Sequence, residues 1–308
     1  MNFTSIIKEI EKSDPEVYER LSTRRGALKS FGSKVALAAL PLALGSLFKK
    51  AYGKTSSASA VIDALNLALE MEYFQYNYYH TANNLPDLIP PSTAFPTGSE
   101  KNGFITIEAQ EKAHILLLNG VVTAMGGTPF TPKNYSATAA NPLYIPNGTY
   151  DFTGGSCGCG IYYDVFNDYP TFLMMAQVFE DTAVHAYKGQ MTNLLGDSGV
   201  LTQAFQIQAT EARHAAHART LRRLPPVNAF ALDVPAPWIT NNIPPVAALQ
   251  PYYIGEDVTQ QLYATDILNI PDAYSSTGTV PKISATAAFD EGMDSGTIIS
   301  LIQPFLIP

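Results

Sequence analysis

The sequence predicts an all-α protein built around four long helices, and three observations lead to this prediction. Four segments repeat apolar residues at intervals of three and four, the spacing of one helix face. Proline and glycine clusters bound these segments. Hydrophobic residues make up 46% of the 308 residues and charged residues 15%, which is typical of a globular protein with a sizeable core.

The first 53 residues differ in character from the rest of the chain. Residues 23–29 read Thr-Arg-Arg-Gly-Ala-Leu-Lys and precede an apolar run of fourteen residues, 35–48. As a helix this run would be about 21 Å long, which is short of the roughly 30 Å hydrocarbon core of a membrane. The pattern resembles a bacterial twin-arginine export signal.

We therefore expect residues 1–53 to be a removable signal segment, with no stable membrane span after its removal. The expected location of the mature protein is periplasmic or otherwise exported. Cleavage after Gly53 is preferred to cleavage after Ala60, because the second position would cut into the start of a helix. An amphipathic N-terminal helix packed on the body is the alternative interpretation.

The four predicted helices lie within residues 54–224, and turn residues mark their ends. Ser57 is a suitable N-cap for the first helix, and Gly126-Gly127 ends the second. Pro170 suits the first turn of the third helix, and Pro225 ends the fourth. The expected helices are residues 57–82, 101–125, 170–195 and 200–224.

The connections between these helices predict the topology. About forty residues separate the second helix from the third, whereas the third and fourth are joined by a tight turn. Four long helices with one long crossover between helices two and three form the plan of a ferritin-like four-helix bundle. Residues 225–308 form a Pro-rich, irregular C-terminal extension with a short helix expected near residues 294–305. Its apolar and aromatic residues predict that it wraps the bundle; a small separate domain is the alternative.

Charge and cysteine content exclude some classes of function. The whole chain has a net charge of −8, but residues 54–308 carry ten basic and twenty-two acidic residues, a net charge of −12. This excess argues against nucleic acid or an anionic membrane surface as a partner. Cys157 and Cys159 are the two cysteines, so no disulfide framework is expected. We interpret Cys-Gly-Cys as a loop feature, with a redox or metal role as the alternative.

Each predicted helix places one glutamate on its apolar face. The residues three, four and seven positions away are mainly apolar or aromatic, as with Leu69 and Tyr76 around Glu72. The second and fourth helices add a histidine one turn later, which gives two Glu-x-x-His motifs. The side chains predicted to converge in the core are Glu72, Glu111, His114, Glu180, Glu211 and His214.

Converging carboxylates predict a pair of metal ions. Buried carboxylates cost several kcal/mol each unless they are paired or coordinated. No lysine or arginine is expected on the same faces, whereas two divalent cations would balance four negative charges. One Glu from each of two helices, with Glu-x-x-His from each of the other two, is the ligand set of carboxylate-bridged di-iron and di-manganese bundles. Oxygen-rich ligation favours iron or manganese over copper or zinc.

Other residues near these motifs have two interpretations each. Either Glu-x-x-His motif alone is more often an exposed hydrogen-bonded pair. Glu108 is a candidate supporting or third carboxylate, or it serves as a cap or surface residue. His217 could orient a ligand, although a structural role is favoured, and His80 and His185 are expected to lie off the site. The tyrosines at 73–79 could tune redox chemistry or simply pack the bundle.

Six phrases carry a resemblance to a known family. They are LNLALEMEYFQYNYY, EAQEKAH, FLMMAQVFEDTAVHAYKG, ATEARHAAH, YYIGEDVTQ and AFDEGMDSGTIISLIQPFL. With these phrases the sequence resembles the ferritin-like-domain family of exported bacterial proteins, which also includes plant desiccation-related proteins. The resemblance implies a ferritin-like bundle with metal positions at the six side chains named above. The crossover at residues 129–168 matches no motif of the family.

Three classes of function follow from these expectations. The first is a di-metal oxidoreductase of the cell envelope that holds two Fe or Mn ions and acts with O2 or peroxide. The second is a stress- or desiccation-associated binding or structural protein whose metal site is structural or vestigial. Iron storage ranks last, because more than eighty C-terminal residues would hinder packing into a cage. The sequence leaves open whether the protein forms a homo-oligomer.

Overall fold

The computed structural model describes most of the chain after residue 56. The predicted export segment and the Cys-Gly-Cys motif lie outside the described residues, so both stay predictions. Ala60, the alternative cleavage position, lies in the first turn of a long helix. The described ranges are residues 57–90, 99–133, 149–155, 160–224, 235–258, 261–262, 265–272 and 275–307.

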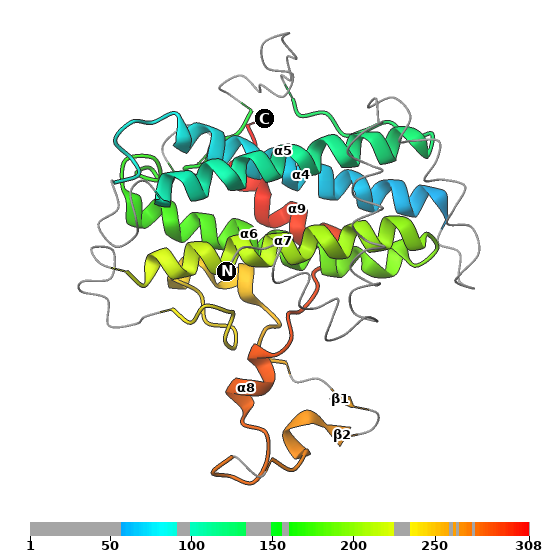
Figure 1. Cartoon of the computed structure of the whole chain (residues 1–308), viewed down its shortest axis with the longest axis vertical. Helices are drawn as coiled ribbons and strands as arrows, with labels where there is room; N and C mark the ends of the chain where they lie inside the picture. The colour runs from blue at the N-terminus through cyan, green and yellow to red at the C-terminus, as the bar shows by residue number, and fades with distance from the viewer. Residues whose placement is uncertain are drawn as a thin grey trace, which may run out of the picture. The chain divides into compact units, whose positions relative to one another are not determined.

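The four predicted long helices are all present and form two antiparallel pairs (Figure 1). The antiparallel direction of the first pair follows from two hydrogen bonds, Asn66 to the carbonyl of Thr128 and Asn83 to that of Phe104. α4 packs along α5, α6 packs along α7, and α4 also packs against α6, whereas α5 and α7 contact each other less closely. The helices are α4 (Ala58–Asn83), α5 (Ser99–Ala124), α6 (Tyr169–Leu194) and α7 (Ser198–Arg222).

Ser57 caps its helix as predicted, and two aspartates that were not predicted cap α6 and α7. The Ser57 side chain accepts a hydrogen bond from the third residue of α4 at 3.1 Å, and Asp168 and Asp197 cap α6 and α7 in the same way. Pro170 lies in the first turn of α6. After α5 the chain passes through Gly126 at φ +80°, a conformation that glycine adopts at little cost.

The core of the bundle is two apolar clusters with a polar layer between them. On α5, Phe104 and Ile107 belong to one cluster, whereas Ile115 and Leu118 belong to the other. The residues between them include Glu111, and α7 changes clusters in the same way around Glu211. The bundle therefore buries its carboxylates at one level along its length. Among the described residues, no helix is long and apolar enough to cross a membrane.

The C-terminal residues form several short elements. The expected short helix is present as α9, which lies against α6 (Figure 1). A two-residue antiparallel hairpin pairs Gln261 with Asp266, and neither it nor α8 was predicted from the sequence. In order, the elements are η1 (Ala247–Tyr253), β1 (Gln261–Leu262), β2 (Thr265–Asp266), η2 (Ile267–Asn269), α8 (Lys282–Ala287), α9 (Ser295–Ile302) and η3 (Gln303–Phe305).

The end of the chain packs into the bundle core. The Phe305 ring is 1% exposed and lies 5.8 Å from the ring of Phe74 and 5.1 Å from that of Phe179, centroid to centroid. The Phe305 carbonyl accepts a hydrogen bond from the Asp151 amide at 2.7 Å. Both the crossover and the C-terminal extension are therefore joined to the four helices through this residue.

A hydrogen bond to a buried ion pair of the bundle also joins the extension to the four helices. Arg219 of α7 contacts both oxygens of Asp181 of α6, at 2.7 Å and 2.5 Å, and both side chains are buried. The Tyr253 hydroxyl from η1 donates to the same carboxylate at 2.7 Å. Because Asp181 has these two partners, its burial is compensated without any metal ion.

The extension passes α6 at a point where two glycines meet. A Cβ on Gly189 would lie 1.8 Å from the carbonyl oxygen of Met293, and a Cβ on Gly292 would lie 2.7 Å from the amide nitrogen of Gly189. The Met293 amide donates to the carbonyl of His185 at 3.1 Å. The close backbone approach therefore requires glycine at position 189.

Two glycine-to-alanine variants should have opposite effects on stability. At Gly120 in α5 an added Cβ meets nothing within 4 Å, so Gly120→Ala should raise the free energy of unfolding by about 0.5–1 kcal/mol. Gly189→Ala has the same helix preference but collides with Met293, and it should lower that free energy by about 1–3 kcal/mol. Denaturant unfolding of both variants measures the difference. Equal stabilisation by the two would show that the extension does not pack on α6 as described.

Candidate metal centre

The six side chains predicted to converge do lie together inside the bundle. None of the four glutamates is exposed to solvent, and the His214 side chain is almost fully buried. Their ligand atoms form two groups, and within each group all atoms lie within 4.8 Å of one another. The first group is Glu72, Glu111, His114 and Glu211, and the second is Glu111, Glu180, Glu211 and His214.

Glu111 and Glu211 belong to both groups, and each turns one oxygen toward each histidine. Glu111 Oε2 lies 3.5 Å from His114 Nδ1, and its Oε1 lies 2.8 Å from His214 Nδ1. Glu211 Oε1 lies 3.2 Å from His114 Nδ1, and its Oε2 lies 3.8 Å from His214 Nδ1. Two carboxylates shared in this way are compatible with a metal site in which both groups take part.

The other two glutamates each serve one group. Glu72 Oε2 lies 3.0 Å from His114 Nδ1, and Glu180 Oε2 lies 3.5 Å from His214 Nδ1. Each group therefore has one histidine, one carboxylate of its own and two shared carboxylates. The two helix pairs contribute equivalent sets of ligands, related by an approximate two-fold symmetry.

Two tyrosines follow the same approximate symmetry. Tyr79 lies seven residues after Glu72, and Tyr187 lies seven residues after Glu180. The Tyr79 hydroxyl donates to Glu180 Oε1, and the Tyr187 hydroxyl donates to Glu72 Oε1 at 2.5 Å. Each helix pair thus holds the unshared carboxylate of the other. Both tyrosines share a helix face with a predicted ligand, a spacing that could have identified these contacts from the sequence.

Two glutamines make the two groups unequal, and sequence reasoning missed both. Gln75 Nε2 donates to Glu180 Oε2 at 2.7 Å and to Glu211 Oε2 at 3.0 Å. Gln110 Oε1 lies 2.6 Å from His214 Nε2. An Nε2–H group donating to that amide oxygen leaves His214 Nδ1 free to face the carboxylates. Both glutamines therefore contact the group that contains Glu180.

The side chains of the centre carry protons that a bound cation would displace. Burial lowers the pKa of His114, but the neighbouring carboxylates, Glu72 foremost, raise it to about 12. The pKa of His214 is raised for the same reason, by Glu180 first. Burial raises the pKa of Glu72 and Glu180 well above the usual range. Burial also raises the pKa of Glu211, but the two neighbouring histidines, His114 first, lower it overall.

The residues present fit a pair of cations. Both oxygens of Glu111, Glu211 Oε1 and His214 Nδ1 are buried and form no hydrogen bond with any described residue. An unsatisfied buried polar group costs about 1–3 kcal/mol. Two atoms that each lie about 2.1 Å from one ion are roughly 3.0–3.4 Å apart, close to the separations found here. Within the described part of the chain, the four carboxylates form ion pairs with histidine and with no lysine or arginine.

Two other residues considered from the sequence lie outside the centre. Glu108 lies 2.7 Å from both His80 Nδ1 and Asn83 Nδ2, one turn from Glu111 but facing away from the other ligands. His217 packs edge-on against Phe104 at 5.6 Å. Glu108 is therefore a surface-side residue that ties α5 to α4, and His217 is a packing residue.

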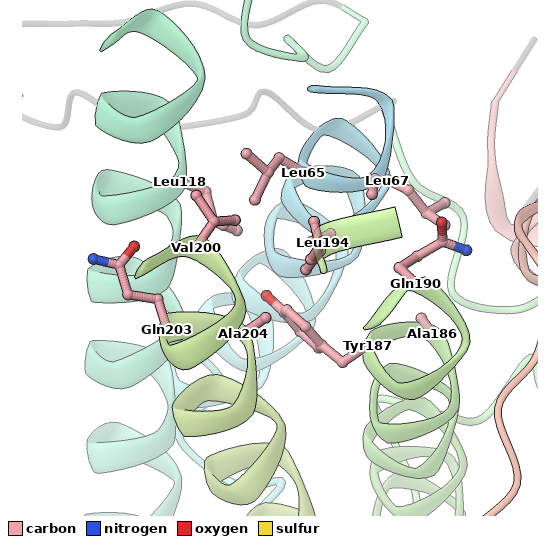
Figure 2. Close-up of a pocket in the computed structure, with 12 residues that line it drawn as sticks. Leu65, Leu67, Leu118, Ala186, Tyr187, Gln190, Leu194, Val200, Gln203 and Ala204 are labelled. Atoms are coloured by element: carbon pink, nitrogen blue, oxygen red, sulfur yellow. The ribbon is translucent and has the colours of Figure 1, made fainter. Parts of the chain in front are cut away.

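A small apolar cavity of about 10 Å³ lies next to the centre (Figure 2). Its lining includes Leu65, Leu118, Val200 and Ala204, from three of the four long helices. Tyr187 also lines the cavity, and its ring extends from α6 toward Ala204 of α7. Because the Tyr187 hydroxyl donates to Glu72, this side chain separates the cavity from the carboxylates.

Metal content should depend on Glu111 and not on Glu108. Glu111→Gln removes the charge of a shared carboxylate, so we expect at least a tenfold weaker binding of Fe2+ or Mn2+. Glu108→Gln makes the same change one turn away, outside both groups, and should leave binding unchanged. Elemental analysis and titration of both variants test this. Equal loss in the two variants would contradict the assignment of Glu111.

Metal affinity should also rise with pH. His114 holds its proton up to a pKa of about 12, so a bound cation must displace that proton at neutral pH. Displacement of at least one proton per ion predicts that the apparent Kd for Mn2+ falls about tenfold or more per pH unit between pH 6 and 8. Calorimetry in buffers of different ionisation enthalpy counts the released protons. An affinity that does not change with pH would show that these groups are not the ligands.

Comparison with known proteins agrees with the architecture. A family model described as the ferritin-like domain matches residues 60–223, which include all four long helices apart from their outermost residues. A search of the curated proteins found no match. The match covers more than half of the chain, and the chain therefore belongs to the ferritin-like domain family.

Proposed function

We propose that this protein is a di-iron or di-manganese oxidoreductase that acts with O2 or peroxide. The observation that carries the proposal is that Glu111 and Glu211 each present one oxygen to His114 and the other to His214. Carboxylates shared between two positions are the feature by which bundles of this kind hold a redox-active metal pair. When bound, such a pair would supply electrons and an open coordination position for O2 or peroxide.

The chain's own residues divide into ligands and residues that position them. Glu72 with His114 would hold one ion, Glu180 with His214 would hold the other, and the two shared glutamates would bind both. Tyr79 and Tyr187 fix the orientation of the unshared carboxylates through their hydroxyl groups. Burial raises the pKa of both phenols well above the usual value, so each hydroxyl keeps its proton beside the centre at neutral pH.

Two features support access by small reactants. The His114 side chain is 13% exposed, whereas the His214 side chain is 4% exposed, so the centre is nearer to solvent on the side of His114. The apolar cavity of about 10 Å³ on the other side of Tyr187 from the carboxylates is a space that an uncharged molecule would occupy in preference to an ion. The apolar clusters on both sides exclude bulk water from the carboxylates.

Single-turnover measurements test the proposed reaction. Protein loaded without oxygen to two Fe2+ or Mn2+ ions per chain should consume O2 or peroxide, and Glu111→Gln should reduce the rate by about a hundredfold or more. Tyr187→Phe should keep the metal and change the rate, because it removes a positioning hydrogen bond and no ligand. Stoichiometric metal with no consumption would instead support the structural alternative. Large assemblies that load many irons per chain would support storage.

We also propose that residues 1–53 direct export to the cell envelope. The proposal rests on Arg24-Arg25 and the apolar run that follows them. Replacing both arginines with lysine should abolish export, because twin-arginine recognition requires the pair and not only its charge. Lys29→Arg is a control that keeps the pair, and its export should be normal. Normal export of the double-lysine variant would overturn the proposal.

A further inference from the structure

A second cluster of potential ligands lies where the C-terminal extension meets α6. His185 comes from α6, Glu256 follows η1, and Asp290 precedes α9. One ligand atom from each residue lies within 4.8 Å of the others. Three segments of the chain, residues 183–189, 252–258 and 288–294, therefore meet at one place. None of the six bundle ligands lies in them.

Two of these side chains are buried without sufficient partners. His185 is 0% exposed and Glu256 is 1% exposed. Neither ring nitrogen of His185 forms a hydrogen bond with the described residues, and neither does Glu256 Oε2. Glu256 Oε1 accepts from the Glu291 amide at 2.9 Å and lies 3.1 Å from His185 Nε2. Ligand atoms that share one ion at about 2.1 Å are separated by roughly this distance.

The charges around the cluster do not balance. Glu256 and Asp290 supply two carboxylates, and burial, with Glu256 as the next cause, raises the pKa of Asp290. Lys188 faces this region, but its Nζ donates to the main-chain oxygen of Asp290. Arg219, a buried guanidinium on the facing helix, is paired with both oxygens of Asp181. A divalent cation would neutralise the two carboxylates and occupy the free nitrogen of the histidine.

We propose that His185, Glu256 and Asp290 bind one divalent metal ion, such as Zn2+ or Mn2+. This ion would hold the C-terminal extension against the bundle. One imidazole nitrogen with two carboxylate oxygens is a donor set that suits both ions. The site shares no ligand with the bundle centre. His185 lies five residues after Glu180, which is roughly 140° around α6.

Backbone contacts around the cluster also hold the extension against α6. Glu256 and Asp290 are far apart in sequence, so one ion would hold two segments of the extension against the same turn of α6. At this turn Gly189 already touches Gly292, and the Met293 amide donates to the carbonyl of His185. Gly255 takes φ +98° directly before Glu256, a conformation that a residue with a side chain adopts rarely. The site is thus built on backbone contacts that hold without the ion.

The test separates this site from the bundle centre. In full-length protein carrying Glu111→Gln and Glu211→Gln, the bundle ligands are disabled, and we expect one Zn2+ per chain to remain. Adding Glu256→Gln should remove that ion, whereas adding the neighbouring Asp257→Asn, with the same change of charge, should leave it. Elemental analysis gives the content, and Co2+ gives a visible absorption spectrum that reports the His and carboxylate ligands. Equal metal content in the Glu256→Gln and Asp257→Asn proteins would overturn the proposal.

A stability measurement provides a second readout. Zn2+ should raise the Tm of the Asp257→Asn protein by several degrees and leave that of the Glu256→Gln protein unchanged. If Glu256→Gln prevents folding, the partly exposed Asp290→Asn variant replaces it, with at least a tenfold weaker Zn2+ affinity expected. Unchanged affinity in that variant would overturn the proposal. If the protein binds no ions at the bundle centre but still binds one ion that depends on Glu256, the proposed function fails and the inference about this site stands.

Discussion

Four carboxylates buried at one level of an apolar bundle are the constraint on which the rest of the structure depends. Glu72, Glu111, Glu180 and Glu211 are all fully buried, and the core divides into one apolar cluster on each side of them. Without cations, protons on the histidines and on two of the glutamates reduce the repulsion, together with hydrogen bonds donated by Gln75 and two tyrosines. The supporting tyrosines and glutamines act on this same layer.

The approximate two-fold symmetry explains why the layer is stable and why its halves can differ. Tyr79 and Tyr187 exchange hydrogen bonds across the helix pairs, so neither pair completes its half of the centre alone. Gln75 breaks the symmetry because its counterpart three residues after Glu180 is Ala183, which cannot donate. Two unequal positions suit a centre in which one ion stays firmly held while the other meets the reactant.

The helices and the six converging side chains could be predicted because both follow from local periodicity. A glutamate flanked by apolar residues at helical spacing must face the core, whatever the rest of the fold. Contacts of the C-terminal extension could not be predicted in this way, since His185, Glu256 and Asp290 meet only through the path of an irregular chain. The same holds for the ion pair of Arg219 with Asp181, which lies on faces that the carboxylate stripes do not include.

The metal–metal distance is the quantity that tests the central claim most directly. X-ray absorption of protein loaded with manganese or iron should show each ion bound by nitrogen and oxygen, with a second metal at about 3.5–4 Å. This result would require the shared carboxylates to bridge two ions as their geometry indicates. A spectrum with no metal neighbour at full loading would contradict the account, because the four buried carboxylates would then be stabilised in some other way.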